Sequence, residues 1–408
     1  MKARVIVMDF GSRTNTFGGE ARMASVLYGG LKEHFSTMYL GYRTEYIDAN
    51  DDTIILKHIK KFAHNPGVKN SGLAENWFMR LGYFSLMGRN LIDIGIKKDA
   101  LADRIKSFSP DIIISNSTWD FSTIRYLRKR MNFKTIYIDH ANISGSNAKN
   151  YFSKAIMPLT LGTGLVGLDI DSIKSKFFKY FDATVALNKS QARKMLKFTD
   201  RAYYIPNGLH VDTTSDSGIE DVIRKRYGVS KSDFVVMYIG RMFERQKNVS
   251  TLIKAFMHLQ NNNIKLLLIG GGQSMADYKR LASGDKRIIF CGEVDDERLP
   301  YIYNLASIFV LPSVWEGFNL TILEAANHRL PLVVSEGAYI DDLKVVKLGK
   351  IITFRTFDHN DLARKILFLM NSAKAMNEAR KVSERLAGMF TQEAMLKKYS
   401  NLIEDLVK

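Results

Sequence analysis

The sequence predicts an α/β protein built from two doubly wound domains that face each other across a cleft. Its 408 residues are too many for one ordinary core, so two domains of about 150–200 residues are expected. Short β-rich runs alternate with helix-patterned stretches, which is typical of parallel sheets covered by helices. Most of these runs are continuous in Val, Ile and Tyr, as expected for strands buried on both faces.

The elements fall into two series separated by a polar segment, 207–232, which reads as a linker. In the first half we expect a helix over 19–34 and strands at 3–10, 37–42, 111–115, 134–139, 183–187 and 203–206. In the second half we expect strands at 234–240, 265–270, 288–291, 308–311 and 332–335. Helices are expected there at 249–260, 277–282, 299–306, 320–327 and 392–407. The predicted domains are 1–207 and 208–391.

The charge of the chain is strongly basic and unevenly distributed. Residues 1–200 hold 30 Lys and Arg against 18 Asp and Glu, or +12, and the remainder holds 29 against 24, or +5, which together make the net +17. This excess points to an anionic partner, namely a membrane surface, a phosphorylated acceptor or nucleic acid. The alternative is a basic surface that only serves solubility.

Two tracts, 57–106 and 151–181, mix basic residues with aromatic ones. Such a mixture suits a membrane interface. It also suits helices whose aromatic face packs in the core and whose basic face is exposed to solvent. The apolar run at 5–8 is too short for a signal peptide, and 155–170 is too short for a membrane span. A single cysteine, Cys291, excludes an intramolecular disulfide and fits a reducing compartment. We therefore expect a cytoplasmic protein, at most peripheral on the inner face of the cell membrane.

The segment 311–326 carries the strongest chemical signal. A strand runs into a turn, and Asn319 is a residue type that favours the N-cap of the following helix. The backbone N–H groups at such a helix start can hold a diphosphate against the helix dipole, and Gly317 lets the backbone approach a ligand closely. The N–H groups concerned are those of Phe318, Asn319 and Leu320.

Two carboxylates flank this helix start, Glu316 before it and Glu324 more than one turn inside it. They are too far apart to share one proton, so they are expected to grip two separate hydroxyl-bearing parts of one extended ligand. A second segment places Arg241 and Lys247 in the loop after a strand that ends at Gly240. Two cations there can neutralise a departing diphosphate. Arg245 is an alternative to Lys247 that the residues alone do not exclude.

These two segments resemble the E-x7-E and G-R-x5-K motifs of family-four retaining glycosyltransferases, which have the GT-B fold of two Rossmann-like domains. The resemblance is close over about residues 200–345, and the first 200 residues match only in outline. It implies that Glu316 binds the donor sugar, that Glu324 holds the ribose of the nucleotide, and that Arg241 and Lys247 clamp the diphosphate. Asn319 departs from the Gly that is common at this place.

Weaker signals extend the same resemblance. His140, after a strand, resembles the histidine that sits against the donor sugar, although a lone histidine is often structural. Gly18 and Gly19 resemble the glycine pair near the donor phosphates, although such a pair is more often a simple turn. Val294 lies in a loop that resembles those cradling the base. The first domain would bind the acceptor, and the helix 392–408 would pack back on it.

The resemblance implies retaining, front-face transfer of a sugar from a nucleotide sugar to a glycan or lipid-linked saccharide in cell-envelope polysaccharide or glycolipid synthesis. UDP is favoured as the nucleotide, and GDP stays open because the base would be read by backbone groups. The sequence has no Asp-x-Asp motif in a metal-binding position, so neither a metal nor another cofactor is expected. The alternatives are a nucleotide-sugar epimerase and a non-enzymatic polyanion-binding protein. No nucleic-acid-binding signature is present, and no nucleic-acid partner is expected.

Overall fold

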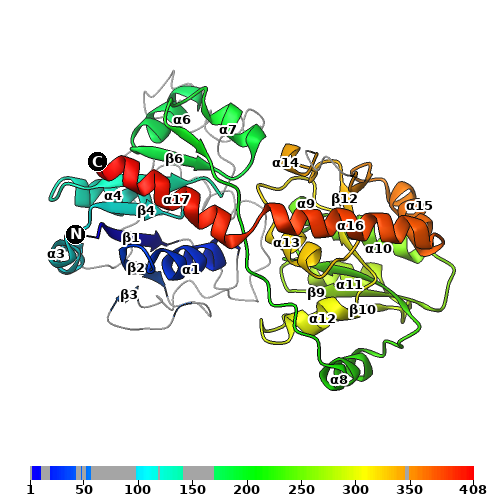
Figure 1. The fold of residues 1–408 in the computed structure, drawn as a ribbon. Coiled ribbons are helices and arrows are strands. Elements are labelled where there is room, and N and C mark those ends of the chain that lie inside the picture. Colours follow the sequence, from blue (N-terminus) through cyan, green and yellow to red (C-terminus); the bar gives the residue numbers. More distant parts are fainter. Residues whose placement is uncertain are drawn as a thin grey trace. The chain divides into compact units, whose positions relative to one another are not determined.

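The computed structural model describes residues 2–10, 19–42, 47, 52–56, 98–117, 120–140, 170–344 and 349–408. The chain forms two compact units, each of which is described by itself below (Figure 1). The first unit comprises Met1–Pro206 and Glu393–Lys408, and the second comprises Asn207–Gln392. The division after Pro206 lies beside the boundary at 207 that the polar segment suggested.

The described strands of the first unit form one parallel sheet in the order β3-β2-β1-β4-β5-β6-β7. They are β1 (Arg4–Asp9), β2 (Ser36–Tyr42), β3 (Thr53–Leu56), β4 (Ile112–Ser115), β5 (Lys134–Ile138), β6 (Ala183–Ala186) and β7 (Ala202–Tyr204). Its described helices are α1 (Gly19–Leu31), α3 (Lys98–Phe108), α4 (Phe121–Arg128), α6 (Ile170–Lys179), α7 (Lys189–Met195) and α17 (Gln392–Val407). The order of the strands reverses between β1 and β4. Ligands of doubly wound folds bind at such a reversal, beyond the carboxyl ends of the strands.

The core of the first unit explains part of the second basic and aromatic tract. Phe177, Phe178 and Phe181 are buried against β5, whereas Lys176 and Lys179 on the same helix are exposed. In this portion these three aromatic side chains are therefore core and these two lysines are exposed to solvent, whereas Lys174 of the same helix is buried. Residues 57–97 and 141–169 lie outside the described residues.

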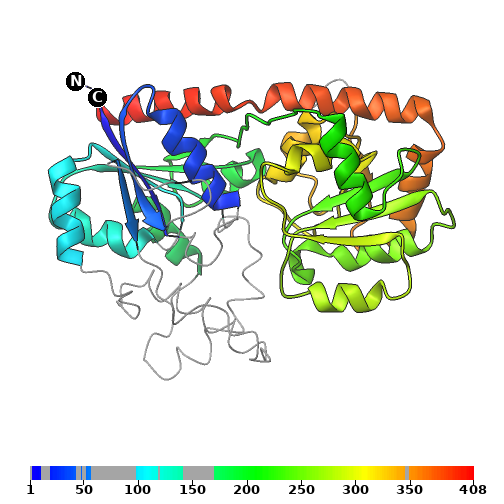
Figure 2. The same cartoon turned by 90° about the horizontal axis from the view of Figure 1, so that it is seen from below.

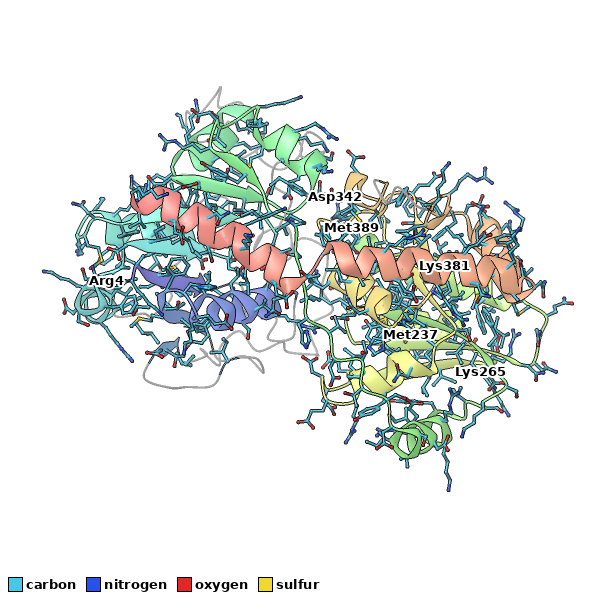
Figure 3. The ribbon with its side chains drawn as sticks, in the orientation of Figure 1. Arg4, Met237, Lys265, Asp342, Lys381 and Met389 are labelled. Carbon is cyan, nitrogen blue, oxygen red and sulfur yellow. The ribbon has the colours of Figure 1, made fainter. Side chains whose placement is uncertain are left out.

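An ion pair joins the starts of the two central strands of this sheet. Arg4, which Figure 3 labels, lies at the beginning of β1 and contacts Asp111, just before β4, at 3.3 Å. The Asp111 carboxylate also accepts a hydrogen bond from the Arg4 backbone N–H at 2.8 Å. These contacts hold together the first residues of β1 and the residue before β4. A ligand is expected at the opposite edge of the sheet, where the strands end.

The strands of the second unit form a parallel sheet in the order β10-β9-β8-β11-β12-β13. They are β8 (Phe234–Ile239), β9 (Ile264–Ile269), β10 (Ile288–Gly292), β11 (Ile308–Leu311), β12 (Leu332–Ser335) and β13 (Ile352–Phe354). Its described helices are α8 (Ser217–Tyr227), α9 (Glu244–Lys247), α10 (Val249–Met257), α11 (Met275–Leu281), α12 (Leu299–Leu305), α13 (Leu320–Asn327), α14 (Asp341–Lys344), α15 (His359–Met370) and α16 (Ala373–Met389). Here the winding reverses between β8 and β11.

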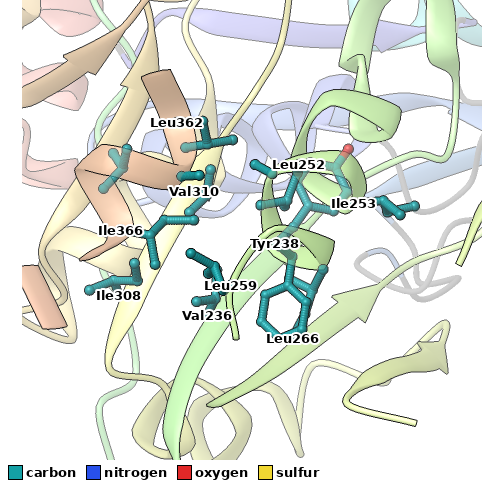
Figure 4. Packing of buried hydrophobic residues seen from close by; sticks show 14 of the residues in the cluster. Val236, Tyr238, Leu252, Ile253, Leu259, Leu266, Ile308, Val310, Leu362 and Ile366 are labelled. Atoms are coloured by element: carbon teal, nitrogen blue, oxygen red, sulfur yellow. The ribbon is translucent and has the colours of Figure 1, made fainter. Parts of the chain in front are cut away.

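Apolar side chains from both layers of the second unit close its core. Val236 and Leu266 on the sheet pack with Leu252 of α10 and Ile366 of α15, all fully buried (Figure 4). Figure 2 shows α16 on one side of this sheet and the yellow-green α10 and α11 on the other. Covering both faces explains why the strands read as continuous apolar runs.

The segment 207–232 is not only a linker, which corrects the expectation from its polarity. It contains α8, whose N-cap Asp216 accepts hydrogen bonds from the N–H groups of Gly218 and Ile219. Gly228 ends the helix in the left-handed conformation at φ 61°. Ile223 is the one buried residue of α8, so the helix had almost no apolar pattern to reveal it.

The last helix belongs to the first unit although it follows the second unit in sequence. α17 buries Met395, Tyr399, Leu402 and Ile403. Gly30 of α1 lies so close to Leu396 that a Cβ on the glycine would stand 2.2 Å from the leucine side chain. The helix therefore packs on α1. Within the described part of the chain, the structure has no helix both long and apolar enough to cross a bilayer.

Candidate functional site

A buried ion pair lies at the winding reversal of the second sheet. Lys247, in the loop and short helix after β8, and Glu316, in the turn after β11, meet at 2.6 Å between Nζ and Oε1. Their side chains are only 10% and 8% exposed. Two charges so removed from water are stable because each neutralises the other, and removing either would leave a costly buried charge. The sequence predicted both residues for one ligand, but not their direct contact.

The two loops that carry this pair are joined along their backbones. The Val314 N–H donates to the Gln246 carbonyl at 2.7 Å. The Asn248 side chain donates to the Pro312 carbonyl at 3.1 Å, and Asn248 itself takes the left-handed conformation, φ 49°, between α9 and α10. The Lys247–Glu316 pair therefore sits on a rigid support.

Glycines let the loops after β8 and β9 approach each other closely. A Cβ on Gly270 would lie 2.2 Å from the Gly240 carbonyl, and Gly270 has a φ of +117°. The Met242 N–H donates to the Gly271 carbonyl at 2.7 Å. No other residue type fits at position 270 without moving the backbone that leads to Arg241.

The start of α13 has the form of an anion-binding site. Asn319 is its N-cap, as predicted, and its side-chain oxygen accepts from the N–H groups of Thr321 at 2.8 Å and Ile322 at 3.3 Å. Among the described residues, the N–H groups of Phe318, Asn319 and Leu320 have no hydrogen-bond acceptor. These donors and the helix dipole favour a phosphate group beside Glu316.

Glu324 is buried inside α13 and has a different environment from Glu316. It is 3% exposed and accepts a hydrogen bond from the Tyr303 hydroxyl at 2.6 Å. The Tyr303 ring stacks on His328 with centroids 4.8 Å apart. Tyr303 and His328 support the predicted ribose-binding carboxylate, and no signal in the sequence pointed to either.

The other residues predicted for this site differ in exposure. Arg241 and Arg245 are exposed, so Lys247, not Arg245, is the cation that lies against Glu316. The Arg241 carbonyl accepts from the Tyr238 hydroxyl at 3.0 Å, which holds the loop backbone at its start. Val294 is half-buried in the loop after β10. Gly317 is half-buried in the turn between Glu316 and α13.

The first unit carries the remaining predicted residues. His140 follows β5, is half-buried, and its Nε2 lies 2.8 Å from Oδ1 of Asn116. Burial lowers the pKa of His140 to about 4. Gly19 is the first residue of α1, and Gly18 lies outside the described residues.

A buried carboxyl group at the same sheet edge was not anticipated. Asp120 accepts hydrogen bonds from the N–H groups of Phe10 at 2.8 Å and Ser117 at 3.0 Å, which ties the chain after β1 to the chain after β4. Burial, with the nearby charge of buried Asp9 as a second cause, raises its pKa well above the usual range of an aspartic acid. Sequence reasoning missed Asp120 because a polar residue before a helix is ordinarily a simple cap.

The described residues contain no group of three or more His, Cys, Asp and Glu side chains arranged to hold a metal ion. Metal independence stays a prediction, because this finding covers only part of the chain.

Residues 233–372 match the family model described as glycosyl transferases group 1. Over 140 residues the chain is 33% identical to the UDP-Gal:alpha-D-GlcNAc-diphosphoundecaprenol alpha-1,3-galactosyltransferase of Escherichia coli. The aligned stretch covers 32% of this chain and 35% of that protein. Over 214 residues it is 26% identical to the alpha-galactosylglucosyldiacylglycerol synthase of Streptococcus pneumoniae, with coverage of 50% and 55%. The matches thus span about half the length of these relatives or less.

Solved structures resemble the fold over nearly the whole chain. Sucrose-phosphate synthase from Thermosynechococcus elongatus has a TM-score of 0.71 at 17% identity and covers 99% of both chains. The Anabaena protein Alr3699/HepE, solved in complex with UDP-glucose, has a TM-score of 0.70 at 13% identity, with coverage of 98% of this chain and 99% of that one. The family resemblance and the predicted GT-B fold are confirmed.

Proposed function

We propose that this chain, whose residues 233–372 match the family model of the group 1 glycosyl transferases, is a retaining glycosyltransferase that uses a nucleotide-sugar donor. The observation that carries the proposal is the buried Lys247–Glu316 pair beside the open start of α13. It brings a cation, a carboxylate and unpaired backbone donors together within the matched region. Diphosphate, sugar hydroxyls and ribose are the groups that such a set of donors and acceptors recognises.

In this proposal the Lys247–Glu316 ion pair separates when the donor binds, and each residue takes a part of the donor as its new partner. The diphosphate takes Lys247 and Arg241 as cationic partners, together with the N–H groups at the start of α13. Glu316, released from Lys247, accepts hydrogen bonds from hydroxyls of the sugar, and Glu324 accepts from the ribose. As the glycosidic bond breaks, the growing charge on the diphosphate is stabilised by donors already in place, so little reorganisation is needed.

We infer the retaining course from the family resemblance, which implies a front-face mechanism. The leaving phosphate oxygen takes the proton of the acceptor hydroxyl, which attacks on the face that the phosphate leaves. No carboxylate then has to act as a covalent nucleophile and no metal has to neutralise the diphosphate. His140 contacts the transferred sugar in this scheme.

The names of the relatives support the choice of substrates. One similar protein is named for UDP-galactose and a diphosphoundecaprenol-linked acceptor, and another for a diacylglycerol glycolipid. A similar structure holds UDP-glucose. We therefore propose a UDP-sugar donor, with a GDP-sugar as the less favoured choice, and a lipid-linked saccharide or glycan acceptor. The net charge of +17 is compatible with an anionic membrane surface as a partner, at which the chain would act from the cytoplasmic side.

A thermal-shift screen of nucleotide sugars tests the proposal. A ligand that binds only the folded protein adds about 2.7 kcal/mol to the free energy of unfolding at 100 times its Kd. The melting temperature rises accordingly. We expect a response to one or more UDP-sugars, followed by sugar transfer to a lipid-linked acceptor with product of the donor's anomeric configuration. A protein that binds no nucleotide sugar would contradict the proposal, as would conversion of the donor to its epimer without an acceptor.

A further inference from the structure

Asn116 occupies a fixed position at the winding reversal of the first sheet. It follows β4 directly and is fully buried. Its backbone N–H donates to the Met8 carbonyl at 2.9 Å, so the residue is held against the end of β1. A buried amide in this place must have partners for its side-chain oxygen and nitrogen, because an unpaired polar group out of water is costly.

The partners of Asn116 determine how its amide is oriented. Its Nδ2 lies 2.8 Å from the backbone carbonyl oxygen of Glu20, in the first turn of α1. A carbonyl can only accept, so the amide nitrogen must face α1. The amide oxygen Oδ1 consequently faces His140, whose Nε2 is 2.8 Å away.

This orientation decides which nitrogen of His140 carries the hydrogen. The Asn116 oxygen cannot donate, so Nε2 of His140 must be the donor. In a neutral imidazole the other nitrogen, Nδ1, then has a free lone pair and can only accept. Burial lowers the pKa of His140 to about 4, so the ring is neutral at physiological pH and Nδ1 keeps its lone pair.

We propose that Asn116 is a positioning residue that locks His140 in the Nε2–H tautomer, so that Nδ1 accepts a hydrogen bond from a sugar hydroxyl of the substrate. The tautomer lock stands on the contacts of the first unit alone, whereas the identity of the ligand as a sugar rests on the proposed function. A lone pair at Nδ1 favours a hydroxyl or an N–H group of the ligand and repels a carboxylate. Asn116 also joins this histidine to the first turn of α1, directly after the Gly18-Gly19 pair.

The test is the tautomeric state of His140 in the ligand-free protein. Long-range ¹H–¹⁵N correlation spectra of the ¹⁵N-labelled full chain separate protonated from unprotonated ring nitrogens, and a His140→Gln variant assigns the signals. At pH 7 we expect Nε2 protonated and Nδ1 unprotonated in the wild type. In Asn116→Ala we expect the Nδ1–H form to appear beside the Nε2–H form, because no acceptor then holds the hydrogen on Nε2. A misoriented sugar contact should lower kcat/KM by about 100-fold.

A matched control separates this role from a general structural one. Asp111 stands at the other end of β4 and holds Arg4, so Asp111→Ala should destabilise the same sheet while leaving the His140 signals unchanged. An Nδ1–H tautomer or a charged imidazolium in the wild type at pH 7 would overturn the proposal. So would a folded Asn116→Ala protein in which the Nε2–H form is as dominant as in the wild type. If Asn116→Ala does not fold, the wild-type spectrum still decides, and it does so whether or not the protein transfers a sugar.

Discussion

The Glu316 carboxylate neutralises a lysine that is nine-tenths removed from water. In Glu316→Gln the shape is kept but Lys247 stays buried beside a neutral amide, so the free energy of unfolding should fall by about 3 kcal/mol. UDP should then raise the melting temperature of this variant more than that of the wild type, because its diphosphate supplies the missing negative charge without displacing a carboxylate. Melting curves over a series of UDP concentrations measure both effects.

The Arg287–Asp285 pair, at 2.7 Å and also largely buried, gives the control for this prediction. Asp285→Asn should lower stability but leave the response to UDP at the wild-type size. Equal UDP-induced shifts in Glu316→Gln and in the wild type would show that Lys247 is not a diphosphate ligand.

His140 makes stability depend on pH in a definite direction. Its pKa falls from the ordinary 6.5 to about 4 on folding, so between these values the unfolded chain binds the proton and the folded one does not. The stability that this contributes is complete above pH 6.5 and is lost as the pH falls towards 4, at no more than about 1.4 kcal/mol per pH unit. Urea unfolding at pH 7.5 and pH 4.5 should show a larger loss in the wild type than in His140→Gln. The raised pKa of Asp120 is common to both proteins and cancels. Equal losses of stability in the wild type and in His140→Gln would contradict the lowered pKa of His140.

At the scale of single elements, the start of α13 combines two functions in one turn. Asn319 caps two N–H groups and leaves the three before them open. Asn319→Ala should cost about 1 kcal/mol, whereas Asn319→Gly, the residue common in the resembled family, should cost only a few tenths. Urea denaturation midpoints of the two variants check this. Equal destabilisation by Ala and Gly would mean that the cap contributes little.

Sequence reasoning predicted some elements closely and missed others. The helices predicted at 320–327 and 392–407 have the bounds of α13 and α17, and in α13 the cap residue Asn319 marked the start. α8 was missed because Ile223 alone is buried, so Asp216 and Gly228 were the only available signals. β3 and β13 are only four and three residues long and follow polar segments, which hides them among loops.

Among the site residues, those in a sequence motif were predicted and those that depend on long-range contacts were missed. Motif spacing identified Glu316, Glu324 and Lys247, and the structure places the first and last in contact. Asn116, Tyr303 and Asp120 carry no motif, because their importance comes from contacts across 24, 21 and 110 residues of sequence. Contacts between distant segments are set by the sheet order, which periodicity alone does not give.

On the scale of the whole molecule, the C-terminal helix completes the first unit. Tyr399 is a fully buried side chain of α17, so Tyr399→Ala should cost about 3–5 kcal/mol through lost packing and a cavity. Hydrogen exchange should show the loss of protection in β1, β2 and α1 and leave the second sheet unchanged. Loss spread evenly over both units would contradict the division of the chain into two compact units.

The central claim is that Glu324 holds the nucleotide of a sugar donor during transfer. The most direct measurement is sugar turnover by folded Glu324→Ala beside the wild type and Tyr303→Phe, which removes the Glu324 hydrogen bond but keeps the carboxylate. We predict a loss of about 100-fold or more in Glu324→Ala, with Tyr303→Phe retaining most activity. Wild-type turnover by a folded Glu324→Ala protein would contradict the account.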